Sequence, residues 1–139
     1  MLKDKFSHES IRDYEDGECI FREGDSSFEM YVVHSGNVLV SKAGLALGEL
    51  SRGEFLGEMS LLESLPRSAT AIAKGKTRLL CIQPGGFLLK IRRDPTFAFE
   101  LLQSLSARIR LTNERLLGSV KAGPVDEQSL QKILDKGAA

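Results

Sequence analysis

Short runs of β-branched and apolar residues recur along the first two thirds of the chain, separated by turns that contain glycine. The runs are ECIFRE, EMYVVHS, NVLVSK, LALGEL, TAIAK and TRLLCIQ, at residues 18–23, 29–35, 37–42, 45–50, 70–74 and 77–83. Regular short strands separated by such turns are typical of a barrel or sandwich. Two packed antiparallel sheets of the jelly-roll type would protect their edges. The pattern therefore predicts a mainly β domain over about residues 10–83.

The last third of the chain has a helical pattern. Pro84 can open a helix over about 84–94, and Asp94-Pro95 can open a second helix over about 95–117, with aspartate as N-cap. Residues of the second helix recur at heptad spacing: Leu102, Leu105, Ile109, Thr112 and Leu116. Such a seam predicts helix pairing, and the hydroxyl of Thr112 interrupts it.

A helix-breaking stretch, GSVKAGP, follows from Gly118. The amphipathic piece at 126–136 is expected to be a short helix or a frayed tail. We therefore expect one domain over 1–121 and a short tail or helix over 122–139.

The stretch FLGEMSLLESLPRSATA places two charges, Glu58 and Arg67, among apolar residues. A buried charge needs a partner. Gly57 would let a backbone approach a ligand, and SLLE reads as one helical turn whose free amides at Ser60 attract an anion. The planar fork of Arg67 suits phosphate oxygens.

These residues fit a ligand with one phosphate and one ribose hydroxyl. Ser68 adds a hydroxyl near that phosphate, Ala69 leaves room, and Glu58 can accept a hydrogen bond from the sugar. The alternative is a structural ion pair between Glu58 and Arg67 in a turn, since short motifs give false positives.

Composition narrows the function classes. The chain has 139 residues, 42% hydrophobic, with 19 basic and 19 acidic residues, so its net charge of zero argues against duplex DNA binding. No signal peptide is expected from the N-terminal residues, and no apolar run is long enough for a membrane span. Cys19 and Cys81 match no zinc or redox spacing and indicate a reduced, cytoplasmic protein.

Catalytic signatures are missing from the sequence. It contains no G-x-S-x-G and no P-loop, and its two histidines, His8 and His34, have no second histidine nearby. A cupin-like metalloenzyme would need a ligand cluster, so neither an enzyme nor a metal site is expected.

The run GEMSLLESLPRSAT, residues 57–70, closely resembles the phosphate-binding cassette of cyclic nucleotide-binding domains, approximately G-E-x-x-L-x(4)-P-R-x-A-T. The run GDSSFEMYVVHSGNVLV, residues 24–40, also resembles the second and third strands of that family. The resemblance covers about residues 10–120. It implies an eight-stranded jelly roll, or double-stranded β-helix, followed by a lid helix and a long signalling helix.

The resemblance also implies roles for the residues. Glu58 would bind the ribose 2′-hydroxyl. Arg67 would bind the cyclic phosphate, and the Arg67 guanidinium would face the ligand or water. Backbone amides near Gly57, Ser60 and Ala69, and the Ser68 hydroxyl, would complete the cradle. Met59 and Leu47 would line the sugar and base pocket.

The run ARIRLTNERLL resembles the dimer helix of the bacterial catabolite activator family, in which a Thr-Ser pair reads adenine across two subunits. Here the pair is Thr112-Asn113, which favours cAMP and a homodimer through 95–117. Ser68 follows the cassette arginine and keeps cGMP open as an alternative. A polar residue merely tolerated in the seam is the structural alternative for Thr112.

Catabolite activators continue into a DNA-binding helix-turn-helix, and the stretch from Gly118 is too short for one. We therefore expect a stand-alone, non-catalytic cyclic nucleotide receptor that does not bind DNA through this chain alone. A nucleotide-free interaction module of the same fold is the other possibility, although such modules usually lose the cassette glutamate or arginine, and both are present here.

Overall fold

The computed structural model describes residues 9–119 and 126–137. The strands are β1 Glu9–Tyr14, β2 Cys19–Phe21, β3 Met30–Lys42, β4 Leu45–Leu50, β5 Phe55–Leu56 and β6 Thr70–Ile82. The helices are α1 Glu58–Glu63, α2 Pro84–Arg93, α3 Pro95–Ser119 and α4 Glu127–Gly137. An antiparallel β domain followed by C-terminal helices confirms the predicted fold class.

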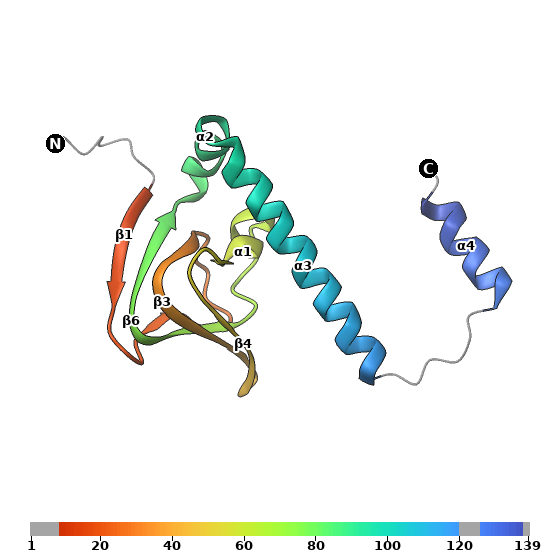
Figure 1. Ribbon diagram of the computed structural model, residues 1–139, viewed down its shortest axis with the longest axis horizontal. Coiled ribbons are helices and arrows are strands. Elements are labelled where there is room, and N and C mark those ends of the chain that lie inside the picture. Colours follow the sequence, from red (N-terminus) through yellow and green to blue (C-terminus); the bar gives the residue numbers. More distant parts are fainter. Residues whose placement is uncertain (1–8, 120–125, 138–139) are drawn as a thin grey trace. The chain divides into compact units, whose positions relative to one another are not determined.

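The strands are hydrogen-bonded in the order β1-β6-β3-β4, and β2 and β5 pair with β6 and β3 respectively (Figure 1). The predicted runs 29–35 and 37–42 form one long strand, β3, and the runs 70–74 and 77–83 form β6. Their pairing shifts register on both sides of Ser35. Irregularities of this kind bend a strand without ending it.

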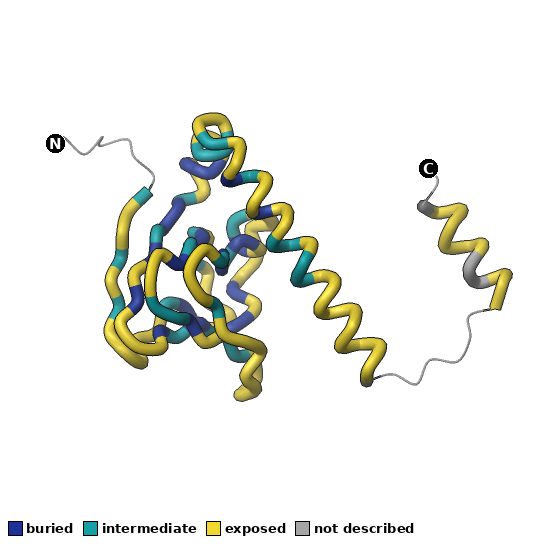
Figure 2. The backbone as a smooth tube through the Cα atoms, viewed as in Figure 1, coloured by how far each residue is buried: buried dark blue, intermediate teal, exposed yellow. Residues whose placement is uncertain are grey.

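The centre of the β domain is apolar. Its buried cluster consists of Phe21, Tyr31, Val33, Val38, Leu56, Ala71, Leu79 and Cys81. In Figure 2, most of the dark blue tube lies within the β domain. Alternate residues of β3 and β6 supply most of the cluster, as expected for strands with one covered face.

Aromatic residues attach the first two C-terminal elements to the β domain. The ring of Phe97 lies edge-to-face against Phe55 of β5, 5.6 Å between centroids, and against Phe87 of α2, 6.2 Å. Such pairs add about 0.5–1.5 kcal/mol each beyond their buried area. Phe97 and Leu101 are buried, which fixes the start of α3 against the cassette strand β5.

The chain divides into two compact units, Met1–Ser104 and Leu105–Ala139. The first holds the sheet, α1, α2 and the start of α3. The second holds the rest of α3 and α4, and its described side chains are exposed from Ile109 onward. Both α3 and α4 begin and end within two residues of the predicted bounds.

Candidate functional site

The cassette links β5 to β6 through α1. Phe55 and Leu56 are buried and anchor its start, and Gly57 turns the chain with a left-handed φ of 80°. Helix α1 begins at Glu58, two residues before Ser60, where the sequence predicted the helical turn to start. A second left-handed residue, Ser64 with φ 55°, ends the helix. These two turns place Glu58 and Arg67 at the ends of one compact loop.

The predicted cassette residues differ in how far they are buried. Glu58, Ser60 and Arg67 are buried, at 4%, 2% and 3% exposure, and Ala69 is also buried. Met59 and Ser68 lie at the surface, where the Ser68 hydroxyl is 3.9 Å from the sulfur of Met59. Three buried polar side chains within ten residues are unusual for a surface loop, because burial costs energy unless the groups are partnered.

The guanidinium of Arg67 is enclosed by protein groups and not turned to water as expected, since its side chain is only 1% exposed. Its Nε donates to Ser27 Oγ at 2.9 Å, and its terminal nitrogens donate to the carbonyl oxygens of Gly57 at 3.2 Å and Glu29 at 2.7 Å. The Glu29 carboxylate lies 3.8 Å away. The fork is therefore held in one orientation.

The backbone of Arg67 is fixed as well. Its N–H donates to the Asp25 carbonyl at 2.9 Å, and its own carbonyl accepts from the N–H of Gly24 at 2.8 Å. The ring of Phe21 lies under the guanidinium, 4.2 Å from ring centroid to Cζ, a cation–π distance. The turn at Gly24-Asp25 thus fixes the position of the Arg67 backbone relative to the apolar core.

Sequence reasoning missed three residues that hold the arginine: Phe21 of β2, and Ser27 and Glu29 in the run 24–40 that resembles the family's strands. Phe21 ends a strand, Ser27 and Glu29 lie just before one, and none of the three carries a motif of its own. The one signal was a carboxylate, Glu29, directly before the buried residues Met30 and Tyr31. Glu29 supplies a carboxylate that pairs with Arg67 in this structure.

Burial and charge act on the two ionisable groups in opposite ways. Burial lowers the pKa of Arg67, and the negative charge of Glu29 partly offsets this. Burial alone would raise the pKa of Glu29, but a backbone hydrogen bond, the Tyr31 hydroxyl and the charges of Arg67 and Arg12 bring that pKa below its ordinary value. At neutral pH the pair is therefore ionised.

Three predicted ligand residues lie outside the cassette. Leu47 lies on β4 with 47% of its surface exposed. Thr112 and Asn113 are exposed on α3, and the Thr112 hydroxyl donates to the Arg108 carbonyl at 2.8 Å, one turn earlier in the helix. Their roles toward a ligand stay predictions.

A depression of about 290 Å³ lies elsewhere, lined by Asp13, Tyr14, Glu15, Ser35, Lys76, Thr77 and Arg78. It shares no residue with the cassette. Its guanidinium, Arg78, is already bonded to Asp13 at 2.7 Å. Among residues 9–119 and 126–137, no three His, Cys, Asp or Glu side chains are grouped to hold a metal ion.

Residues 11–94 match the family model of the cyclic nucleotide-binding domain. The chain belongs to this family. The match contains the whole cassette and the strands that hold Arg67. It is a family of regulatory binding domains, and the antiparallel sheet with its C-terminal helices is the corresponding fold.

The chain matches parts of longer relatives. The cyclic AMP receptor protein of Thermus thermophilus is 39% identical over 102 residues, 70% of this chain and 47% of that protein. A cGMP-dependent protein kinase of Eimeria tenella is 37% identical over 79 residues, 57% of this chain and 8% of the kinase. The chain thus spans less than half the length of either relative.

The fold comparison agrees with the family. The crystal structure of the Thermus thermophilus catabolite activator protein matches with a TM-score of 0.69 at 37% identity, over 78% of this chain and 54% of that chain. No helix within the described part of the chain is long and apolar enough to cross a membrane.

Proposed function

We propose that this domain is a cyclic nucleotide receptor that binds cAMP through residues 57–69. The observation that carries the proposal is the arrangement around Arg67: a buried guanidinium fixed by Ser27, Gly57 and Glu29, at the far end of a short loop from buried Glu58. A cation held in one orientation binds a phosphate with little loss of freedom. A buried carboxylate can accept a hydrogen bond from a sugar hydroxyl.

In this proposal the arginine uses its remaining N–H groups for the cyclic phosphate. A guanidinium has five N–H groups, and three of them donate to protein oxygens in the bonds described above. Backbone amides near Gly57, Ser60 and Ala69 and the Ser68 hydroxyl supply the other phosphate contacts. Glu58 takes the ribose 2′-hydroxyl, and Met59 and Leu47 cover the sugar and base.

The choice of cAMP depends on Thr112 and Asn113, which lie on α3 and would contact the base. The cyclic AMP receptor protein of Thermus thermophilus supports this choice as a relative. Ser68 and the cGMP-dependent kinase relative favour cGMP as the second candidate. Parallel titrations with the two nucleotides separate these candidates directly.

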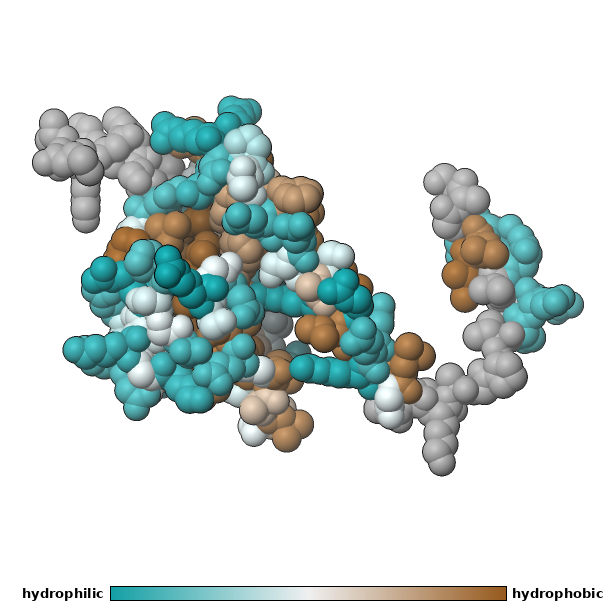
Figure 3. Space-filling model, viewed as in Figure 1, coloured by the Kyte–Doolittle hydropathy of each residue, from teal (hydrophilic) through white to brown (hydrophobic). Residues whose placement is uncertain are grey.

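We propose further that the receptor is a non-catalytic, cytoplasmic homodimer paired through α3. The seam residues Leu102, Ile109 and Leu116 expose 65%, 62% and 55% of their surface. Brown hydrophobic side chains face solvent along α3 in Figure 3. Apolar positions at heptad spacing on a solvent-facing helix favour a second copy of the same helix. Nucleotide binding would then bias the position of α2 and α3, which requires different affinity in the two states.

Isothermal titration calorimetry with cAMP and cGMP tests the receptor. We expect Arg67→Lys to weaken cAMP binding roughly 10- to 100-fold, because a charged, two-pronged hydrogen-bond donor is replaced by a point charge. Glu58→Gln should weaken it in the same direction. Glu63→Gln changes an exposed carboxylate on the same helix and should leave affinity unchanged.

Two outcomes would contradict the proposal that the cassette binds the nucleotide. If wild-type protein binds neither nucleotide, the domain is an interaction module of the same fold. If Arg67→Lys and Glu58→Gln bind cAMP as well as wild type, the nucleotide binds somewhere other than the cassette.

A further inference from the structure

Arg67 and three other side chains form a closed series of contacts. The guanidinium lies over the ring of Phe21, and that ring stacks on Tyr31 with centroids 6.1 Å apart. The Tyr31 hydroxyl donates to Glu29 Oε1 at 3.0 Å. The other carboxylate oxygen, Oε2, lies 3.8 Å from Arg67. Each member therefore limits the position of the next, and the series returns to the guanidinium.

A second guanidinium reaches this series from strand β1. Nη1 of Arg12 donates to the Tyr31 hydroxyl at 3.3 Å and lies 3.9 Å from Glu29 Oε1. One carboxylate is thus flanked by two guanidinium groups, one on each oxygen. Arg12 is 40% exposed, Glu29 20% and Arg67 1%, so the series runs from the surface to the buried cassette cation.

Tyr31 helps to fix this arrangement. The residue is 1% exposed, and a buried hydroxyl is stable only when it is hydrogen-bonded. Its proton goes to Glu29, and its oxygen accepts from Arg12. Burial raises the pKa of Tyr31, so the hydroxyl stays a donor. Because Tyr31 donates to Oε1, the other oxygen, Oε2, is left on the side of Arg67, where it also accepts from the Phe28 N–H at 3.2 Å.

We propose that Arg12 and Tyr31 are positioning residues for the phosphate-binding arginine, acting through Glu29. This inference rests on the proposed function of the cassette. Tyr31 holds the carboxylate that orients the guanidinium, which lowers the entropy lost when a phosphate binds. Arg12 shares the charge of Glu29, so Arg67 keeps more of its own positive charge for the phosphate. Affinity for the nucleotide thereby depends on strand β1, outside the family cassette.

The variants Tyr31→Phe and Arg12→Gln test the inference, with cAMP as the probe in calorimetry. Tyr31→Phe removes the hydrogen bond to Glu29 and the one from Arg12, and Arg12→Gln removes the second alone. A hydrogen bond contributes about 0.5–1.5 kcal/mol, so each variant should weaken cAMP binding by at least roughly 2- to 10-fold. Arg12→Lys keeps the charge and should recover part of the affinity. The ³¹P resonance of bound cAMP should move in Tyr31→Phe, because the guanidinium beside the phosphate changes its position. A purely structural role would leave that resonance in place.

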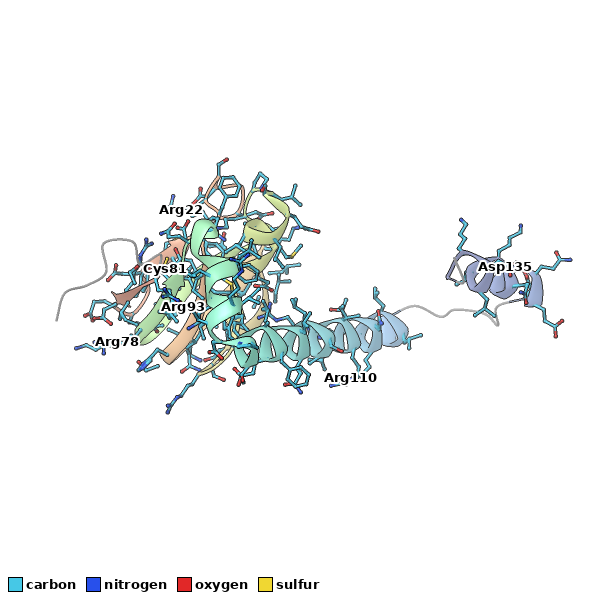
Figure 4. The ribbon with its side chains drawn as sticks, turned by 90° about the horizontal axis from the view of Figure 1, so that it is seen from above. Arg22, Arg78, Cys81, Arg93, Arg110 and Asp135 are labelled. Atoms are coloured by element: carbon cyan, nitrogen blue, oxygen red, sulfur yellow. The ribbon has the colours of Figure 1, made fainter. Side chains whose placement is uncertain are left out.

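The same sheet offers two matched controls. Arg78→Gln breaks a pair between β6 and Asp13 of β1 that does not touch this series, and Arg78 projects away from the sheet in Figure 4. Thr77→Val removes a buried hydroxyl that donates to the Asn37 and Gly75 carbonyls. Both should lower the melting temperature and leave cAMP affinity and the ³¹P resonance unchanged.

The outcomes separate the two proposals. If wild type binds cAMP and both Tyr31→Phe and Arg12→Gln bind it equally well, the positioning role is wrong and the receptor stands. Equal losses in the two controls would also overturn it, because the effect would then be one of general stability. If Tyr31→Phe does not fold, the half-exposed Arg12 carries the test. If wild type binds neither cAMP nor cGMP, both proposals fall.

Discussion

The carbonyl oxygen of Gly57 accepts a 3.2 Å hydrogen bond from Arg67, across a space that any side chain at position 57 would fill. A Cβ on Gly57 would lie 2.6 Å from Nη1 of Arg67 and 2.9 Å from the Glu29 carbonyl. The two ends of the cassette are therefore in contact only because one of them is glycine.

Gly57→Ala is expected to lose both stability and nucleotide affinity. The left-handed φ of 80° costs an alanine about 1–3 kcal/mol, and the new methyl group also displaces the guanidinium. Urea denaturation and cAMP titration measure the two losses. Gly44→Ala is the matched control, since Gly44 has φ 77° with nothing within 4 Å of its Cβ. A normal cAMP affinity in Gly57→Ala would contradict the packing argument.

Substitution of Gly36 should also reduce the stability of the fold, without an effect on nucleotide affinity. Its Cβ would strike the Lys76 carbonyl oxygen and lie 2.7 Å from the Cα of Thr77, both backbone atoms of β6. Because backbone cannot move aside cheaply, Gly36→Ala should cost about 2–4 kcal/mol of unfolding free energy. Gly17→Ala has the same φ of 82° in open space and should cost less. Equal losses would mean that backbone strain alone matters at position 36.

Gly36 also explains where sequence reasoning went wrong on the strands. A glycine between two apolar runs predicted a turn, yet β3 continues through it. The glycine is there because β6 crosses close by, and that neighbour is 40 residues away in the chain. Strand β1 was missed because it lacks an alternating apolar face, and its Ile11 is 52% exposed. The strand is held by its backbone pairing with β6, which is also distant in the sequence.

The cassette could be predicted because its chemistry lies in consecutive residues. Gly57, Glu58 and Arg67 occur within one loop, so their spacing suggested either an anion site or an ion pair, and the resemblance to the family cassette favoured the anion site. The groups that hold the arginine could not be predicted in this way. Glu29 and Ser27 are 38 and 40 residues from Arg67, and only the pairing of β3 with β5 and β6 brings them to it.

Acid should weaken the fold through Glu29. Its pKa in the folded protein lies below the ordinary value of 4.5, so its stabilising effect is complete above that pH and is lost as pH falls through the lower, folded value. Glu29→Gln should therefore reduce the free energy of unfolding at pH 7, by about 0.5–1.5 kcal/mol, because Arg67 and Arg12 lose their shared anion. Near pH 3 the difference between variant and wild type should shrink. Urea denaturation at both pH values checks this, and a difference that is the same at both would contradict the ionised pair.

The exposed seam of α3 gives a separate prediction on assembly. Ile109→Glu places a charge in the middle of the proposed helix pair, where it would repel its copy and lose apolar burial, so the dimer should dissociate at least 10-fold more readily. Leu111→Glu is the control: Leu111 is also exposed, at 49%, but lies two residues on, about 200° around the helix. Arg110, between them, projects away from α3 (Figure 4). Light scattering over a concentration series, with and without cAMP, measures the mass. A monomeric wild type at high concentration in both conditions would rule out the dimer, and a monomeric Leu111→Glu would place the interface on another face of the helix.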